Sequence, residues 1–255
     1  MLSTANQPDL IISLSRDRVT LELSALPDIG RSYWKTSFDV ESIFLKDQIS
    51  HSIDKVLFDN PVLLDHFNCV EIIVLDRPNV TIPFRYLENG GAVDIASRYL
   101  RPRTGDTLNA DTLNNDSVFC YTMPTETLKM LKEYYANINV THLCSVLWKA
   151  ISAHENFLQE AVTYYTTIGN TLNVLASKND KLLFSKNFNI QEEEDLVYYV
   201  IACSRMLQSN EHWLVTIENK ESIFKIPDDT FLKIDNHLSL PSLHTLLAQY
   251  KPCGS

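Results

Sequence analysis

Two periodic patterns alternate along the chain, and they predict strands followed by a helix. Leu10 to Leu14 and Val19 to Leu23 are short runs of strand-forming residues, and the polar turn between them predicts a hairpin. A third strand is predicted around Tyr33 to Phe38. After Asp39, which we interpret as a helix N-cap, apolar residues recur every three to four positions from Leu45 to Val56, the period of one helix face. The pattern therefore predicts three strands and then a helix.

The next apolar run completes this unit. Val70 to Leu75 is almost continuously apolar, which is typical of a strand covered on both faces. The first part of the chain is therefore predicted to have the order β-β-β-α-β.

The same order returns about 150 residues later. Thr163 to Thr167 and Thr171 to Ala176 flank a turn at Gly169-Asn170, and a third strand is predicted for Lys181 to Phe188. Asn189 takes the N-cap place of Asp39, and Glu192 gives it a capping-box pattern. A helix with Leu196, Val200, Cys203 and Leu207 on one face and a strand at Trp213 to Ile217 follow. An internal duplication explains this agreement better than coincidence.

Short sequence matches support the duplication. Thr20 to Leu23 matches Thr171 to Val174 at an offset of 151 residues, and Trp34 to Val40 matches Phe184 to Ile190 at an offset of 150. The chain is therefore predicted to be an α/β protein with two similar subdomains, residues 1–153 and 154–255.

The first subdomain carries additional material. A polar insertion is predicted at about residues 87–117, then a strand at 118–123, a helix at 124–135, a strand at 139–143 and a helix at 144–154 that joins the halves. Another short helix is predicted at 241–250.

Charge and composition narrow the classes of function. The chain has 22 Lys and Arg against 32 Asp and Glu, a net charge of −10. This balance disfavours binding to nucleic acid or an anionic membrane surface, because both need basic surface. No apolar run approaches the roughly 20 residues of a membrane span, and the N-terminus has no signal-peptide pattern. A cytoplasmic protein is predicted. Arg98, Arg101 and Arg103 form a local basic cluster that suits either a phosphate or acidic partner or, more simply, a solvated loop.

Cysteine and histidine give little specific chemistry. The five Cys are scattered, with no Cys-x-x-Cys pair, which favours buried free thiols over a disulfide framework. His142 and Cys144 are two residues apart, and two such ligands on one strand face are compatible with a metal site. Packing or a local hydrogen bond explains the pair better, because no second pair accompanies it.

The strand order and three segments resemble a known group of proteins. The segments are LIISLSRDRVTLEL, VEIIVLDRPNVTIPFRYL and TIGNTLNVLASKNDKLLFSKNFNI, which together sample most of the chain. They are similar to a small Bacteroidetes family of unknown function with the actin-like ATPase fold, as in actin, Hsp70 and sugar kinases. The resemblance implies a bacterial protein with a duplicated actin-like (ribonuclease H-like) fold, in which two mixed-sheet subdomains surround a cleft.

The resemblance also implies where a nucleotide would bind. In the superfamily, two glycine- and aspartate-bearing hairpins hold ATP and Mg²⁺ between the halves. The corresponding hairpins here carry the candidate cleft residues, but Ser and Thr replace Asp, and only one glycine remains. These candidates are Ser13, Ser15, Arg16, Arg18, Thr166, Gly169, Asn170 and Thr171. The segment after Ile217, Glu218-Asn219-Lys220-Glu221, also lacks the glycine pair that makes room for the nucleoside.

Three functions are compatible with these features. Loss of the Asp and Gly residues favours a non-catalytic interaction or scaffold protein, a pseudo-ATPase with an unknown protein partner. The alternative is an atypical ATP-binding or kinase-like protein that uses the same cleft, with ATP and Mg²⁺ as cofactors that the motifs do not support. A small-ligand sensor is the third hypothesis. No catalytic residue and no metal site is predicted.

Overall fold

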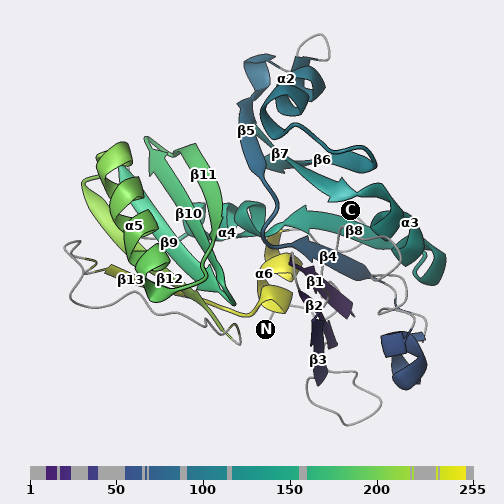
Figure 1. The fold of residues 1–255 in the computed structure, drawn as a ribbon. Coiled ribbons are helices and arrows are strands. Elements are labelled where there is room, and N and C mark those ends of the chain that lie inside the picture. The colour runs from purple at the N-terminus through teal and green to yellow at the C-terminus, as the bar shows by residue number, and fades with distance from the viewer. Residues whose placement is uncertain are drawn as a thin grey trace.

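The computed structural model describes residues 10–15, 18–23, 34–39, 55–64, 67, 69–86, 91–113, 117–154, 160–218, 220, 234 and 236–250. Within these ranges the chain forms two five-stranded sheets, a third sheet of three strands, and helices that join and cover them (Figure 1).

The first five-stranded sheet has the strand order β3-β2-β1-β4-β8. Its first three strands form an antiparallel meander, and β4 and β8 continue it in parallel from β1. All five residues of β1 and of β4 are buried, because these central strands are covered on both faces. The strands are β1 (Leu10–Leu14), β2 (Arg18–Leu23), β3 (Trp34–Asp39), β4 (Val70–Val74) and β8 (Ile138–His142).

The second five-stranded sheet repeats this plan. Its order is β11-β10-β9-β12-β13, again an antiparallel meander extended by two parallel strands. The strands are β9 (Val162–Ile168), β10 (Thr171–Lys178), β11 (Lys181–Asn189), β12 (Glu211–Ile217) and β13 (Asn236–Leu240). One face packs on α5 (Glu193–Leu207), whose buried residues Leu196, Val200 and Cys203 contact Tyr165, Leu172 and Val174.

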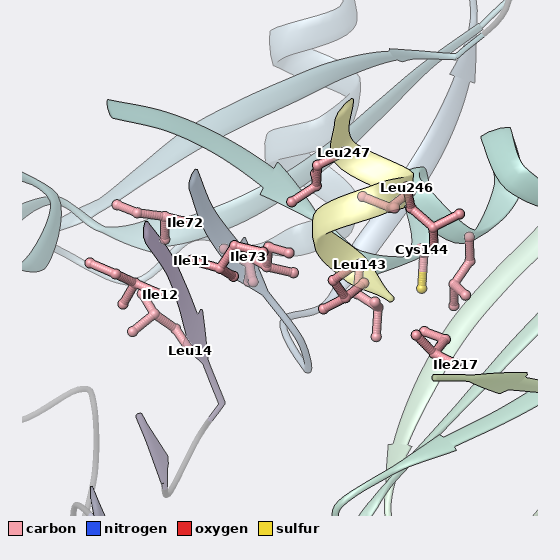
Figure 2. Packing of buried hydrophobic residues seen from close by; sticks show 14 of the residues in the cluster. Ile11, Ile12, Leu14, Ile72, Ile73, Leu143, Cys144, Ile217, Leu246 and Leu247 are labelled. Atoms are coloured by element: carbon pink, nitrogen blue, oxygen red, sulfur yellow. The ribbon is translucent and has the colours of Figure 1, made fainter. Parts of the chain in front are cut away.

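Two helices join the sheets at the centre of the molecule. α4 (Leu143–Ser152) follows β8, α6 (Leu243–Tyr250) follows β13, and the two helices pack on each other. Figure 2 shows side chains from β1, β4, α4, α6 and β12 meeting in this core. Because one continuous apolar cluster includes residues of both sheets, the two halves share their principal core.

The third sheet, with the order β5-β7-β6, forms a small module on the first half. It comprises β5 (Asn79–Pro83), β6 (Asp106–Leu113) and β7 (Ser117–Pro124). The 3-10 helix η3 (Phe84–Tyr86) follows β5, and α2 (Gly91–Leu100) packs on the sheet through Ala96. α3 (Thr125–Tyr134) follows β7 directly, and another 3-10 helix, η2 (Pro61–Leu64), precedes β4. β5 also contacts β11 of the second half.

The predicted strands and the helices after residue 117 are present, with one displaced helix start. β11 extends to Asn189, which pairs with Thr171, so Asn189 is a strand residue rather than an N-cap. The N-cap of α5 is Glu192, whose backbone N–H donates to the carboxylate of Asp195. Asp39 is likewise the last residue of β3. The helix face predicted from Leu45 to Ile53 lies outside the described residues.

Several other predictions are refined. The insertion at 87–117 contributes α2, β6 and the first residue of β7. The division into residues 1–153 and 154–255 stays a prediction; α4 ends just before it. Cys120, Cys144 and Cys203 are free and buried as expected, but Cys69 is disulfide-bonded, which corrects the expectation of a free thiol there.

Candidate functional site: a cavity between the two hairpins

Strand pairing in the first sheet builds a polar face. Ser13 of β1, Thr20 of β2 and Ser37 of β3 lie side by side in the register, and the Thr20 and Ser37 hydroxyls are 3.0 Å apart, a hydrogen-bond distance. In the adjoining part of the same face, Glu22 pairs across the strands with Lys35. Residues at alternate positions of a strand share one face, so these side chains all point to the same side of the sheet.

That face lines a cavity of about 170 Å³ between the two halves. The opposite wall is the tip of the β9–β10 hairpin, and a residue beyond β12 closes one side. The lining residues are Ser13, Ser15, Arg18, Thr20, Lys35, Ser37, Leu75, Ile168, Gly169, Asn170, Thr171 and Lys220.

Six of the eight candidate residues from the sequence line this cavity. They are Ser13, Ser15, Arg18, Gly169, Asn170 and Thr171. Thr166 is buried within β9, with 2% of its surface exposed, and is not part of the lining. Arg16 lies outside the described residues. The geometry thus brings the two hairpins together, while their function as a binding site stays a prediction.

Ser13 and Ser15 of the first hairpin differ in their hydrogen bonding. The Ser15 hydroxyl donates to the backbone carbonyl of Arg18 at 3.0 Å, and its oxygen accepts from the Arg18 backbone N–H at 3.1 Å. Ser15 therefore closes the turn. The Ser13 hydroxyl is also buried, with 2% exposure, but it has no hydrogen-bond partner among the described residues. A buried polar group without a partner is uncommon and calls for an explanation.

The second hairpin keeps the single glycine for a conformational reason. Gly169 has a φ of +57°, in the left-handed region where a side chain is strained. It sits in a two-residue turn between β9 and β10, and such tight hairpins favour positive φ. The backbone carbonyl of Asn170 accepts from the N–H of Ile190 at 2.7 Å, which fixes the turn against the end of β11.

Among the described residues, three cationic side chains line the cavity. Arg18 contacts the carboxylate of Asp39 at 2.9 Å on the exposed rim. Lys220, just beyond β12, crosses to the first half and forms a buried ion pair with Glu22 of β2. Burial lowers the pKa of Lys220, while the Glu22 carboxylate counteracts this and the nearby Lys35 lowers it further. Lys35 is exposed at the edge of the cavity.

Sequence reasoning missed Lys220, Lys35 and Glu22. The segment at Lys220 drew notice only for its lack of glycine, and no local signal indicates that its side chain reaches β2. Glu22 is the partner 198 residues away. Alternation along β2 places Glu22 on the same face as Thr20, which is the one clue the sequence offers.

The donor set of the cavity is unsuited to a divalent metal. None of its described lining residues is Asp, Glu, His or Cys. Throughout the described part of the chain, no three such side chains come together as a metal site. Mg²⁺ prefers carboxylate and carbonyl oxygens, whereas three cationic side chains face this space. The carboxylate or histidine that usually serves as general base is likewise missing from this part of the lining.

The His142–Cys144 pair has a hydrogen-bonding role. The backbone N–H of Cys144 donates to Nδ1 of His142 at 3.1 Å, so His142 caps α4, and its Nε2 lies 3.0 Å from the Arg77 carbonyl oxygen. Burial lowers the pKa of His142 to about 4, which keeps the ring neutral near pH 7, and raises the pKa of the Cys144 thiol to about 12. The pair lies in a polar junction in which Asp111 accepts from the His142 backbone N–H.

This architecture places the chain in the class of proteins with an actin-like ATPase fold. A Bacteroides thetaiotaomicron VPI-5482 protein with that fold and unknown function has a TM-score of 0.73 and 16% identity, over 97% of this chain and 98% of its own. The match confirms the predicted fold. The chain belongs to the DUF3822 family of proteins of unknown function, whose family model matches residues 1–218. No curated protein matches it.

Other solved structures are more distant. The PilM–PilN type IV pilus biogenesis complex has a TM-score of 0.45 and 9% identity, over 82% of this chain and 81% of the other. An inorganic polyphosphate/ATP-glucomannokinase from Arthrobacter sp. strain KM has a TM-score of 0.44 and 10% identity, over 95% of each chain. Likenesses this weak carry no argument about function. None of the described helices is long and apolar enough to cross a membrane.

Proposed function

We propose that this protein is a non-catalytic interaction protein that has kept the actin-like framework and lost ATP turnover. One observation carries the proposal: the described lining of the cavity between the hairpins presents hydroxyls and cations, with no carboxylate to position a metal ion or activate water. Ser13 and Thr166 stand where the resemblance predicts aspartates. Without those carboxylates, a phosphoryl-transfer site lacks its metal ligands and its base.

The ion pair across the cleft supports the same proposal. Lys220 and Glu22 have side chains that are 7% and 3% exposed, so a nucleoside entering between them would separate two buried charges. Leaving either charge buried and unpaired is strongly unfavourable. The cavity of about 170 Å³ is also smaller than the roughly 300–1,000 Å³ typical of sites for larger ligands. A bound nucleotide would therefore require the halves to move apart.

One observation favours the alternative of an atypical ATP-binding protein. Arg18, Lys35 and Lys220 surround the cavity, and cations are the side chains that neutralise phosphate. Such a protein would bind the nucleotide without the usual metal ligands.

A Mg-ATP titration followed by thermal unfolding separates the two functions. For an interaction protein without ATP turnover, Mg-ATP at millimolar concentration leaves the melting temperature and phosphate release unchanged. A site filled to about 100 times its Kd would stabilise the fold by roughly 2.7 kcal/mol, which is easily detected. A saturable shift with ATP that disappears in Lys220→Met would overturn the proposal.

The partner is proposed to be a protein that contacts the small module. Arg98 and Tyr99 of α2 and Arg101 beyond it are exposed, and Tyr99 has 75% of its surface accessible. Arg and Tyr are enriched at the centres of protein interfaces. Deleting residues 87–117 would remove α2 and β6, so point substitutions are the better test.

Affinity capture from the native cell is then compared among three proteins. Wild type retains a partner that the Arg98→Ser, Tyr99→Ser double variant loses. Tyr198→Ser is the matched control, because Tyr198 is 66% exposed on α5 of the other half. Retention of every partner by the double variant would remove the module from the proposal.

A further inference from the structure

The cavity between the hairpins has a charge that contrasts with the rest of the molecule. The chain carries a net charge of −10, yet Arg18, Lys35 and Lys220 line this one space, and its described lining contains no carboxylate. A recess lined by one sign of charge concentrates ions of the opposite sign. The lining therefore attracts anions and repels metal cations.

Only part of this positive charge is neutralised within the described part of the fold. Glu22 forms its ion pair with Lys220, whereas none of the described carboxylates forms an ion pair with Lys35, which lies beside Glu22 in the strand register. The two lysines are near enough for Lys35 to lower the pKa of Lys220. Arg18 has its own partner, Asp39, at the exposed rim. One lysine charge is thus left for an anion in the cavity.

A buried hydroxyl points to the same kind of ligand. Ser13 lines the cavity, is 98% buried, and its hydroxyl has no hydrogen-bond partner among the residues that the structure describes. A hydroxyl donates one hydrogen bond and is strengthened as a donor by a charged acceptor. Its neighbours in the register, Thr20 and Ser37, hydrogen-bond to each other. Among Ser13, Thr20 and Ser37, the Ser13 hydroxyl is therefore the one available to hydrogen-bond to a ligand.

The size of the cavity limits the ligand. Its volume of about 170 Å³ is close to the roughly 150 Å³ of an engineered protein cavity that holds one benzene molecule. A tetrahedral oxyanion fits such a space, and a nucleotide does not. Asn170 and Thr171 of the second half supply further polar groups on the far wall.

We propose that the cavity binds a small oxyanion, of the size of phosphate or sulfate, without a metal ion. The Ser13 hydroxyl donates to the anion from the floor of the first sheet, Lys35 supplies the positive charge that is left, and Lys220, held by its ion pair with Glu22, lines the cavity beside it. Because the walls come from both halves, the bound anion connects β1–β3 with the β9–β10 hairpin. This site is independent of the proposed interaction function, since it needs neither ATP nor a partner.

Binding is tested on the full chain by isothermal titration with inorganic phosphate. The ionic strength is held constant with sodium chloride, EDTA is present, and sulfate and acetate are titrated in parallel. Saturable binding of phosphate at one site in EDTA is expected. Sulfate binding alongside phosphate identifies a general tetrahedral oxyanion site, and stronger binding of acetate than of either would overturn the tetrahedral class.

Variants locate the site. Ser13→Ala is expected to weaken phosphate binding by about tenfold or more, because it removes a hydrogen bond to a charged group. Lys35→Met tests the same site from an exposed position, so it remains informative if Ser13→Ala folds poorly. Lys181→Met is the matched control, an exposed lysine on β11 outside the cavity lining. Equal losses in Lys35→Met and Lys181→Met would show non-specific attraction and overturn the site.

A competition with nucleotide keeps the two proposals apart. Phosphate binding in EDTA with no effect of Mg-ATP leaves both standing. The absence of saturable phosphate or sulfate binding overturns the anion site and leaves the interaction function intact. Displacement of phosphate by Mg-ATP retains the anion site and overturns the claim that the cleft excludes nucleotides. Binding that requires Mg²⁺ overturns the metal-free site.

Discussion

The two five-stranded sheets have the same strand order and directions, yet their facing surfaces serve different purposes. In the first sheet, the polar face of β1–β3 lines the cavity, and Lys35 and Ser37 on its edge strand stay exposed. In the second sheet, the corresponding face of β9–β11 is largely buried against the first half. Thr166 pairs with Asn173 in the register, and Asn173 pairs with Asn187.

Contacts from the first half cover this second polar face. The Cys144 thiol of α4 lies 3.5 Å from the Asn173 side-chain oxygen, to which it donates, and the Asn187 amide donates to the Arg77 carbonyl at 3.0 Å. The first sheet therefore turns its polar face to the cavity, whereas the second uses the part of that face around Asn173 and Asn187 to hold the halves together. A shared topology fixes where these faces lie, and the side chains at a few register positions decide what each does.

The largest effect is expected at the ion pair that crosses the cavity. Lys220→Met leaves Glu22 buried without this partner and should lower the free energy of unfolding by about 3–5 kcal/mol. The double variant Glu22→Leu, Lys220→Met removes both charges and should recover most of that loss. Urea unfolding of the three proteins measures both differences.

The exposed Lys181→Met is the control for this pair. A surface substitution away from special contacts should change stability by less than about 0.5 kcal/mol. If the stability change of Lys220→Met is equally small, the ion pair does not hold the two halves together. The contrast between a cavity wall and an interface would then not include this pair.

A smaller effect is expected from pH at the strand–helix junctions. β8 leads into α4 through His142, and β13 leads into α6 through Ser242, whose hydroxyl accepts from the Thr245 N–H at 3.4 Å. Burial lowers the pKa of His142 to about 4 in the fold, against the 6.5 of a histidine in the unfolded chain. Between those values the unfolded chain binds the proton and the folded chain does not, so stability falls as the pH falls from about 6.5 to about 4.

The contribution of His142 to this fall is about 3 kcal/mol over the whole interval. His142→Asn keeps an acceptor for the Cys144 N–H and should flatten the dependence of unfolding free energy on pH. His237→Asn, on the exposed side of β13, is the control. Urea unfolding at several pH values measures the slopes, and an unchanged slope in His142→Asn would show that other groups carry the acid sensitivity.

Much of the fold was predictable because its strands have strong local patterns. Leu10–Leu14 and Val70–Val74 are short, predominantly apolar runs, and both are fully buried strands. The end of β11 was predicted wrongly because Asn189 is a preferred N-cap by residue type, whereas Glu192, the observed N-cap, is not. The pairing of Asn189 with Thr171 across the sheet keeps Asn189 in the strand. Such tertiary contacts override local capping preference.

The sequence matches between the two halves do not all correspond to equivalent positions in the two sheets. The matched pair Thr20 and Thr171 does not share a place in the register: Thr20 faces Ser37, whereas Thr171 faces Asn189. If Ser37 corresponds to Asn187 at the offset of 150, the residue of the second sheet equivalent to Thr20 is Asn173, because it pairs with Asn187 as Thr20 pairs with Ser37. The β1–β2 and β9–β10 turns have the same length, since Ser13 pairs with Thr20 and Thr166 pairs with Asn173, each seven residues apart, so the sequence match at 151 lies two residues out of register with the fold. The β10–β11 connection is shorter than the β2–β3 connection, because Asn173 pairs with Asn187, 14 residues on, whereas Thr20 pairs with Ser37, 17 residues on.

The candidate site was predictable only in its local parts. The two hairpins were predicted from the polar turns between their strands, and their place on one cleft was what the resemblance to the actin-like fold implied. Lys35 and Lys220 were missed because their place in the cavity depends on the register of β3 and on a crossing from β12 to β2. Long-range contacts of this kind leave no periodic signal in the chain.

The smallest effect separates the two polar faces most directly. Asn187→Ala removes the amide that donates to the Arg77 carbonyl at 3.0 Å and should cost about 1–2 kcal/mol, because that part-buried acceptor loses a hydrogen bond. Ser37→Ala, at the offset of 150 on the exposed edge strand β3, loses only a solvent-accessible hydroxyl pair with Thr20 and should cost less than about 0.5 kcal/mol. Denaturant midpoints at unchanged m-values give both numbers. Equal losses would mean that the two faces contribute alike to stability, and the division between a ligand face and an interface face would then be wrong.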